Sequence, residues 1–140
     1  MPAKPRDADY RRLLEFRTGL RRFLRWSEEQ AEAAGITPLQ HQLMLAIRGD
    51  DDPRGPTISA IATYLVSKHH SVVELVDRAE AAGLVRRVQD AGDHRVVRLM
   101  LTWSGEQILE ELGALTLAEL SRLAPRMREM WTGLELAGNA

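Results

Sequence analysis

The chain has 140 residues, enough for one compact domain. Its hydrophobic share of 44% and charged share of 28% are typical of a globular protein and exclude a disordered chain. No stretch is apolar over the roughly 18 residues that a membrane span requires, and the N-terminus lacks a signal-peptide core, so we expect a cytoplasmic protein with no membrane partner. Because cysteine is absent, disulfides, thiolate metal ligands and cysteine nucleophiles are excluded.

The formal net charge of −1 does not by itself favour a nucleic-acid partner. The charge is unevenly distributed, however. Residues 1–25 hold eight basic and three acidic side chains, and residues 57–98 hold six basic and five acidic ones together with three of the four histidines. Positive charge is therefore concentrated in two separate segments, and the total cannot decide the question.

The first half of the chain predicts two helices and a loop. Apolar residues recur at helical spacing over 9–34, and Gly35 supplies a stop. Thr37 as N-cap, followed by a proline at the first helical position, predicts a second helix that ends near Arg48. The acidic segment 50–56 contains proline and glycine and predicts a connecting loop.

Two further helices are expected next. A brief strand at 57–58 precedes a short helix, which we expect to be capped by Ser59 and to end near Leu65. After a tight turn, Ser67 is expected to cap a longer helix over 68–82, with one apolar stripe turned inward.

The period then changes from helical to alternating. Residues 84–88 and 96–101 predict two short strands around a polar tip at 89–95. Thr102 is expected to cap another helix, and Pro125 fits the first turn of a separate last helix.

This order predicts a mainly α fold with a small β-hairpin wing. It is a winged helix-turn-helix flanked by N- and C-terminal dimerisation helices, divided as residues 1–36, 37–101 and 102–140. Such a unit can place its second helix in the major groove of DNA, while a cationic hairpin tip reaches the backbone or the minor groove.

The candidate DNA contacts lie on the outward face of the longer helix, at its N-terminal end, or on the hairpin. Backbone N–H groups left unpaired in the first helical turn suit a phosphate. These candidates are Ser67, Lys68, His69, His70, Ser71, Val73, Glu74, Arg78, Arg86, Arg95 and Arg98. The alternative for each is an ordinary solvated side chain.

The sequence resembles MarR-type winged helix-turn-helix regulators over nearly its whole length. The resemblance is carried by Gly83-Leu84-Val85-Arg86-Arg87, Asp90, Asp93-His94-Arg95, Leu99-Met100-Leu101-Thr102 and Gly105, and by Leu75-Val76-Asp77-Arg78 before them. It implies a homodimer with interlocked first and last helices, in which each subunit reads half of a palindrome. It also implies that Asp93 orients Arg95 by a salt bridge and that Arg95 enters the minor groove.

Two residues depart from the family pattern. His94 stands where a second arginine is common, which lowers the expected charge of the wing. Glu74 lies on the groove-facing surface, where it repels phosphate unless it accepts a hydrogen bond from a cytosine amine.

The terminal helices carry apolar stripes that would lie exposed in a monomer, which independently favours a homodimer. The resemblance also implies a pocket between the dimerisation helices and the DNA-binding lobe, for a small aromatic or amphipathic effector. Candidate lining residues are Phe16, Phe23, Trp26, His41 and Met44. The alternative is that they are ordinary core residues.

We therefore interpret the chain as a dimeric regulator, a repressor that binds double-stranded DNA at a palindromic operator and is released by an effector. The alternative is a winged-helix protein–protein interaction module that has lost DNA binding, favoured by the net charge, Glu74, Asp77 and His94. We expect neither a cofactor nor a metal, because adjacent helical residues such as His69 and His70 point about 100° apart. No nucleophile–base pair, phosphate loop or metalloprotease motif indicates an enzyme.

Overall fold

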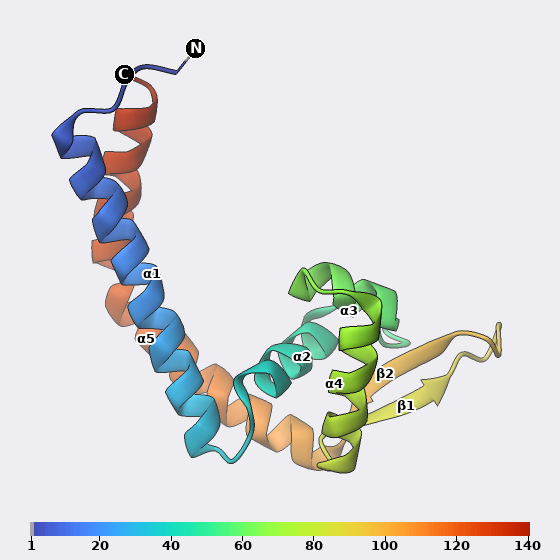
Figure 1. Ribbon diagram of the computed structural model, residues 1–140. Helices are drawn as coiled ribbons and strands as arrows, with labels where there is room; N and C mark the ends of the chain where they lie inside the picture. The colour runs from blue at the N-terminus through green and yellow to red at the C-terminus, as the bar shows by residue number, and fades with distance from the viewer. Residues whose placement is uncertain (1) are drawn as a thin grey trace. The chain divides into compact units, whose positions relative to one another are not determined.

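The computed structural model describes residues 2–140 and divides into two compact units (Figure 1). We name residues 31–113 the winged lobe, and residues 2–30 together with 114–140 the helix pair. The winged lobe is longer at both ends than the segment 37–101 expected to bind DNA. No helix among the described residues is both long and apolar enough to cross a membrane.

The helix pair consists of most of α1 (Asp7–Ala33) and the C-terminal part of α5 (Trp103–Gly138), which lie side by side in Figure 1. The ring centroids of Phe16 and Trp131 are 6.1 Å apart. Met130 lies so close to Gly19 that a Cβ there would meet its methyl carbon at 3.3 Å. A glycine at this point lets the two helices approach each other.

Pro125 does not begin a separate helix, so that prediction was wrong: α5 runs without a break from Trp103 to Gly138. Proline removes one backbone donor and usually ends or kinks a helix. Here Leu123 and Met130, on either side of the proline, line the same cavity with residues of α1. The apolar spacing that continues through Pro125 is the physical reason that we infer for the unbroken helix.

Besides the end of α1 and the start of α5, the winged lobe holds three helices and two strands. They are α2 (Pro38–Gly49), α3 (Ile58–Leu65), α4 (His69–Ala81), and the hairpin of β1 (Val85–Gln89) and β2 (Val97–Leu101). The strands pair antiparallel, with Val85 opposite Leu101 and Gln89 opposite Val97. This is the mainly helical fold with a β-hairpin wing that the sequence predicted.

The start of α2 follows the prediction closely. Thr37 and Gln40 form a capping box, in which the Thr37 hydroxyl accepts from the Gln40 N–H at 3.1 Å. The Gln40 side-chain oxygen accepts from the Thr37 N–H at 3.0 Å. Two of the donors that a helix start leaves unpaired are thereby satisfied.

The cap and strand predicted before the short helix were wrong. Thr57, not Ser59, caps α3, with its hydroxyl accepting from the Ala60 N–H at 3.2 Å. The expected strand is reduced to one bridge between Thr57 and Arg98. This pairing keeps Thr57 extended, and the helix begins at the next residue.

The cap predicted for α4 was also wrong. Lys68 occupies the N-cap position without a side-chain hydrogen bond. Ser67 instead belongs to the end of α3, because its N–H bonds to the Ala62 carbonyl oxygen at 3.0 Å. Val66 between them takes a left-handed conformation, with φ of 50°.

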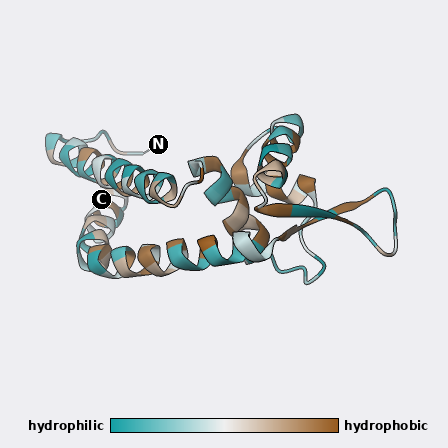
Figure 2. Ribbon diagram, turned by 90° about the horizontal axis from the view of Figure 1, so that it is seen from below, coloured by the Kyte–Doolittle hydropathy of each residue, from teal (hydrophilic) through white to brown (hydrophobic). Residues whose placement is uncertain are grey.

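All buried hydrophobic side chains of the described residues belong to the winged lobe. Leu43, Ile61, Val76 and Leu99, from α2, α3, α4 and β2, are fully enclosed. In Figure 2 hydrophobic and hydrophilic positions alternate along the long helices, as expected of amphipathic elements. The core thus fixes α4 and the hairpin, the two elements that carry the candidate DNA contacts.

Candidate nucleic-acid interface

The N-terminal end of α4 is exposed and cationic. Ser67, Lys68, His69 and His70 are all exposed, and α4 begins at His69. No side chain caps this end, so the first backbone N–H groups of the helix lack side-chain acceptors. Unpaired N–H groups beside the Lys68 ammonium favour an anion such as a phosphate.

The outward face of α4 carries charges of both signs. Glu74 and Arg78 are exposed, whereas Ser71 and Val73 are half-buried. Asp77 is not a free acid, because it accepts a hydrogen bond of 2.6 Å from Arg87 Nη2. A neighbouring strand of the hairpin therefore neutralises one of the two acids that favoured a protein partner.

The tip of the hairpin presents one oriented arginine. Arg95 Nε and Nη2 donate to the two carboxylate oxygens of Asp93, each at 3.1 Å, and the Arg95 N–H also bonds to Asp93 at 3.0 Å. The side-chain hydrogen bond from Arg95 holds the pKa of Asp93 below its ordinary value. The Arg95 side chain is 90% exposed, so the pair orients the guanidinium without burying it.

The four arginines predicted on the hairpin fall into two groups. Arg86 and Arg95 are exposed. Arg87 donates to Glu80 at 2.7 Å as well as to Asp77, which ties β1 to α4. Arg98 is only 14% exposed and donates to two carboxylates. Two arginines thus face solvent, whereas Arg87 and Arg98 are largely covered and are each shared between two carboxylates.

Two acidic residues near the hairpin were missed by sequence reasoning as site residues. Asp90 is 8% exposed and accepts from the backbone N–H groups of Gly92 and Asp93, at 3.0 and 2.9 Å. The hydrogen bond from the Asp93 N–H is the largest of the effects that hold its pKa below the ordinary value. An aspartate two residues before a glycine is a recognisable turn signal and would have indicated this role.

The second missed residue is Asp52, in the loop between α2 and α3. Its carboxylate accepts from Arg54 Nε at 3.1 Å and Arg54 Nη2 at 2.9 Å, and from Arg98 Nη1 at 3.1 Å. The side-chain hydrogen bonds from Arg54 lower the pKa of Asp52 to about 2. No local pattern could reveal its pairing with Arg98, because 46 residues separate the two.

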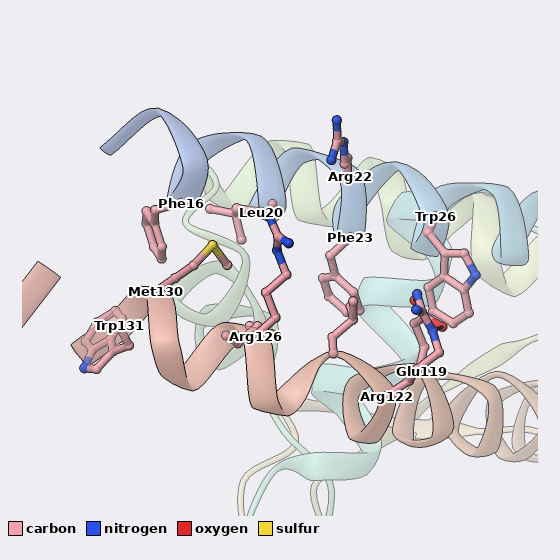
Figure 3. Close-up of a pocket in the computed structure, with 13 residues that line it drawn as sticks. Phe16, Leu20, Arg22, Phe23, Trp26, Glu119, Arg122, Arg126, Met130 and Trp131 are labelled. Atoms are coloured by element: carbon pink, nitrogen blue, oxygen red, sulfur yellow. Dashed lines mark hydrogen bonds and ion pairs between the residues drawn. The ribbon is translucent and has the colours of Figure 1, made fainter. Parts of the chain in front are cut away.

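The helix pair encloses a cavity of about 500 Å³ (Figure 3). Its lining contains three of the predicted effector contacts, Phe16, Phe23 and Trp26, and the arginines Arg22, Arg122 and Arg126. Arg122 Nη2 is paired with Glu119 at 2.6 Å.

The other two predicted effector contacts lie elsewhere. His41 and Met44 are buried in the winged lobe and do not line this cavity. Burial lowers the pKa of His41, because the charged imidazolium is disfavoured away from water.

Comparison with known proteins agrees with this architecture. The model of the MarR family matches residues 34–96. A MarR family transcription regulator of known structure is 21% identical, over 94% of this chain and 87% of its own, with a TM-score of 0.78. A MarR family protein from Bacillus stearothermophilus is 28% identical, over 83% of this chain and 77% of its own, with a TM-score of 0.69.

A third similar structure is the M. tuberculosis transcriptional regulator MosR in complex with DNA. It is 21% identical, over 91% of this chain and 95% of its own, with a TM-score of 0.60. No curated protein sequence matches the chain.

These matches and the helix–turn–helix–hairpin order define a winged helix-turn-helix protein. Since the family model spans α2 to the tip of the hairpin, the resemblance predicted from the sequence is confirmed. The chain is therefore similar to MarR family proteins in sequence over residues 34–96, and to MarR family transcription regulators in fold over most of its length.

Proposed function

We propose that the protein is a dimeric repressor of transcription that binds a palindromic operator and is released by a small-molecule effector. Each subunit inserts the N-terminal part of α4 into the major groove and Arg95 into the adjacent minor groove. The location that follows for such a regulator is the cytoplasm.

The observation that carries DNA binding is the exposed Arg95 guanidinium, held by both carboxylate oxygens of Asp93. An arginine already oriented loses less side-chain freedom when it binds a phosphate or a base edge. The exposed cationic N-terminus of α4 supplies a second anion-binding element in the same lobe. MosR, which has the same fold, was crystallised with DNA.

Dimerisation is supported by the exposed apolar side chains of the helix pair. Large hydrophobic residues of both helices are substantially exposed, including Leu14 at 66%, Leu117 at 70% and Leu136 at 70%. An exposed apolar surface of this kind favours burial against an equivalent surface of a second copy. The two-fold symmetry of such a dimer matches a palindrome with half-sites about one helical turn apart.

Effector binding is supported by the cavity of the helix pair. Aromatic and thioether side chains surround it, and the guanidinium of Arg126, which lies between the two helices in Figure 3, has no ion-pair partner within residues 2–140. An apolar volume with a cationic group suits a small amphipathic effector with an anionic group. Native mass spectrometry of the purified protein would detect such a molecule if it co-purifies.

The test is selection of genomic fragments by the purified protein, followed by titration of the best fragment at two salt concentrations. We expect a palindrome and affinity that falls steeply with salt, because phosphate contacts release counterions. Arg95→Ala should weaken binding by about ten- to a hundred-fold and reduce the salt slope by about one.

The matched control is Arg48→Ala. Arg48 is an exposed arginine of the same lobe that lies outside α4 and the hairpin and pairs with Glu106. Its removal changes the net charge equally but should leave the salt slope as it is. Equal slopes for wild type and Arg95→Ala would contradict a minor-groove role for Arg95, and no enrichment at low salt would favour the protein-interaction module.

A further inference from the structure

We propose that Asp52 is a positioning residue for the wing: it holds Arg98, and through Arg98 and Asp90 it fixes the turn that presents Arg95. The inference rests on the proposed DNA-binding function, because it assigns Asp52 a role in that binding from outside the groove-facing surface. We name the ion pairs of Asp52, Arg98 and Asp90 the wing latch.

Arg98 forms hydrogen bonds with two separate parts of the winged lobe. Its Nη1 donates to Asp52 at 3.1 Å and to the carbonyl oxygen of Gly55 at 3.3 Å, and its Nε donates to Asp90 at 3.1 Å. Arg98 is therefore bonded on one side to the loop between α2 and α3 and on the other to the start of the hairpin turn. Its charge is shared by two carboxylates, which leaves little of it for a phosphate.

Backbone contacts between the loop and β2 accompany these ion pairs. The Leu99 N–H bonds to the carbonyl oxygen of Pro56 at 2.9 Å, next to the bridge between Thr57 and Arg98. Gly55 has φ of 92°, and a Cβ there would strike the carbonyl oxygen of Leu99. The loop is thus closely docked along β2, on the strand that carries Arg98.

Asp90 connects Arg98 with the tip of the hairpin. The carboxylate of Asp90 that accepts from Arg98 also accepts from the N–H groups of Gly92 and Asp93. Asp93 in turn orients Arg95. A continuous series of hydrogen bonds and ion pairs therefore connects Asp52 with the arginine at the tip.

The latch predicts an effect opposite in sign to that of charge alone. Removing an acid from a DNA-binding lobe strengthens phosphate binding if only net charge matters. Asp52→Asn also removes the carboxylate that pairs with Arg54 at 2.9 Å and leaves it only the longer pair with Asp90 at 3.8 Å, so a charge argument predicts a further gain. If Asp52 positions the wing, the same substitution weakens DNA binding, because Arg95 is no longer held in place.

The experiment compares Asp52→Asn with Asp51→Asn in the full-length protein. Asp51 is the adjacent residue, exposed and with no hydrogen bond or ion pair within residues 2–140, so the change of charge is the same. We measure amide hydrogen exchange of Leu99, Gly92 and Asp93 in the free protein, and the affinity for the selected operator.

We expect exchange several-fold faster and DNA affinity about three- to ten-fold weaker for Asp52→Asn, and no change in exchange or weakening for Asp51→Asn. The proposal is overturned if Asp52→Asn exchanges like wild type, or if it binds DNA as tightly as wild type or more tightly.

The two readouts separate this proposal from the proposed function. If the wild type selects no DNA at low salt, the proposed function is wrong, and Asp52 has no role in DNA binding. The exchange rates are measured without DNA, so they still show whether the wing latch holds the hairpin.

Discussion

The winged lobe and the helix pair use hydrophobic residues in opposite ways. In the lobe, residues of α2, α3, α4, both strands and the start of α5 enclose a common core, within which Leu43 and Leu99 have no exposed surface. In the helix pair, no described hydrophobic side chain is fully buried, and large ones such as Leu14 and Leu117 lie mostly in solvent. A single chain therefore buries its hydrophobic side chains in the winged lobe but leaves those of the helix pair in contact with water.

This difference indicates where stability and assembly reside. The lobe holds its core without a partner, so its folding depends on packing within the chain. The helix pair leaves apolar surface exposed. Under the proposed dimerisation a second copy covers that surface, and the stability of the helix pair then depends on protein concentration. Substitutions in the two units should therefore differ in their effects, and a buried histidine of the lobe should add a smaller dependence on pH.

The largest effect is expected for Leu43→Ala in the core of the winged lobe. It should lower the free energy of unfolding by about 2–5 kcal/mol, because a buried leucine is replaced by a cavity. The comparison is Leu14→Ala, at an exposed position of α1. In a monomer this second change should matter by less than about 0.5 kcal/mol.

Chemical unfolding at two protein concentrations distinguishes the two variants. We expect the loss for Leu43→Ala to be the same at both concentrations, and the midpoint of Leu14→Ala to depend on concentration differently from wild type. If Leu14→Ala follows the wild type at every concentration, the exposed surface of α1 at Leu14 is not covered by a second copy.

A smaller effect is expected for Thr37→Ala at the start of α2. Loss of the capping box with Gln40 should cost about 1 kcal/mol of unfolding free energy, because helix-start donors lose their acceptors. The matched change is Thr132→Ala, at an exposed position within α5. It should be neutral or slightly stabilising, since alanine favours a helix interior. If Thr132→Ala lowers the free energy of unfolding as much as Thr37→Ala does, the effect at Thr37 does not come from the capping box.

The smallest effect concerns pH and His41, the buried histidine of the lobe. Burial lowers its pKa in the folded chain, whereas in the unfolded chain it titrates near about 6.5. Below that pH the unfolded chain binds a proton that the folded chain resists, so stability falls as pH decreases towards the folded pKa. Unfolding measured between pH 7.5 and 5 should show this slope.

The variant His41→Gln should flatten the slope, and His70→Gln, at an exposed position of α4, serves as the comparison. Most carboxylates stay ionised over this interval, and those that begin to protonate near pH 5 do so in all three proteins alike. An equal slope in all three proteins would show that burial of His41 does not govern it.

Much of the fold could be predicted because its signals are local. Thr37-Pro38 marks the start of α2, and helical spacing separates buried Val72 and Val76 from the exposed face of α4. The wrong cap at Ser67 came from a local turn, the left-handed Val66, whereas two other wrong predictions depended on distant parts of the chain. Pairing of Thr57 with Arg98 set the start of α3, and packing against α1 accompanies the continuation of α5 past Pro125.

The candidate site also contains ion pairs that the local sequence indicates and ion pairs that it does not. Asp93 and Arg95 are two residues apart, so a local motif indicates their pairing. Arg98 is as prominent in the sequence as Arg95, but its partner Asp52 comes from another loop. Sequence reasoning therefore recognised the cationic residues of the hairpin but could not distinguish exposed arginines from those held by distant carboxylates.

Gly55 has a consequence for the mutational tolerance of this chain. Its positive φ disfavours every side chain, and the carbonyl oxygen of Leu99 occupies the place of a Cβ. Gly49, six residues earlier, has open space around the same atom and an ordinary φ. In a library that varies each position in turn and retains folded proteins, position 49 should therefore accept many residues. Position 55 should retain glycine almost exclusively, although only six residues separate Gly49, at the end of α2, from Gly55 in the loop that follows.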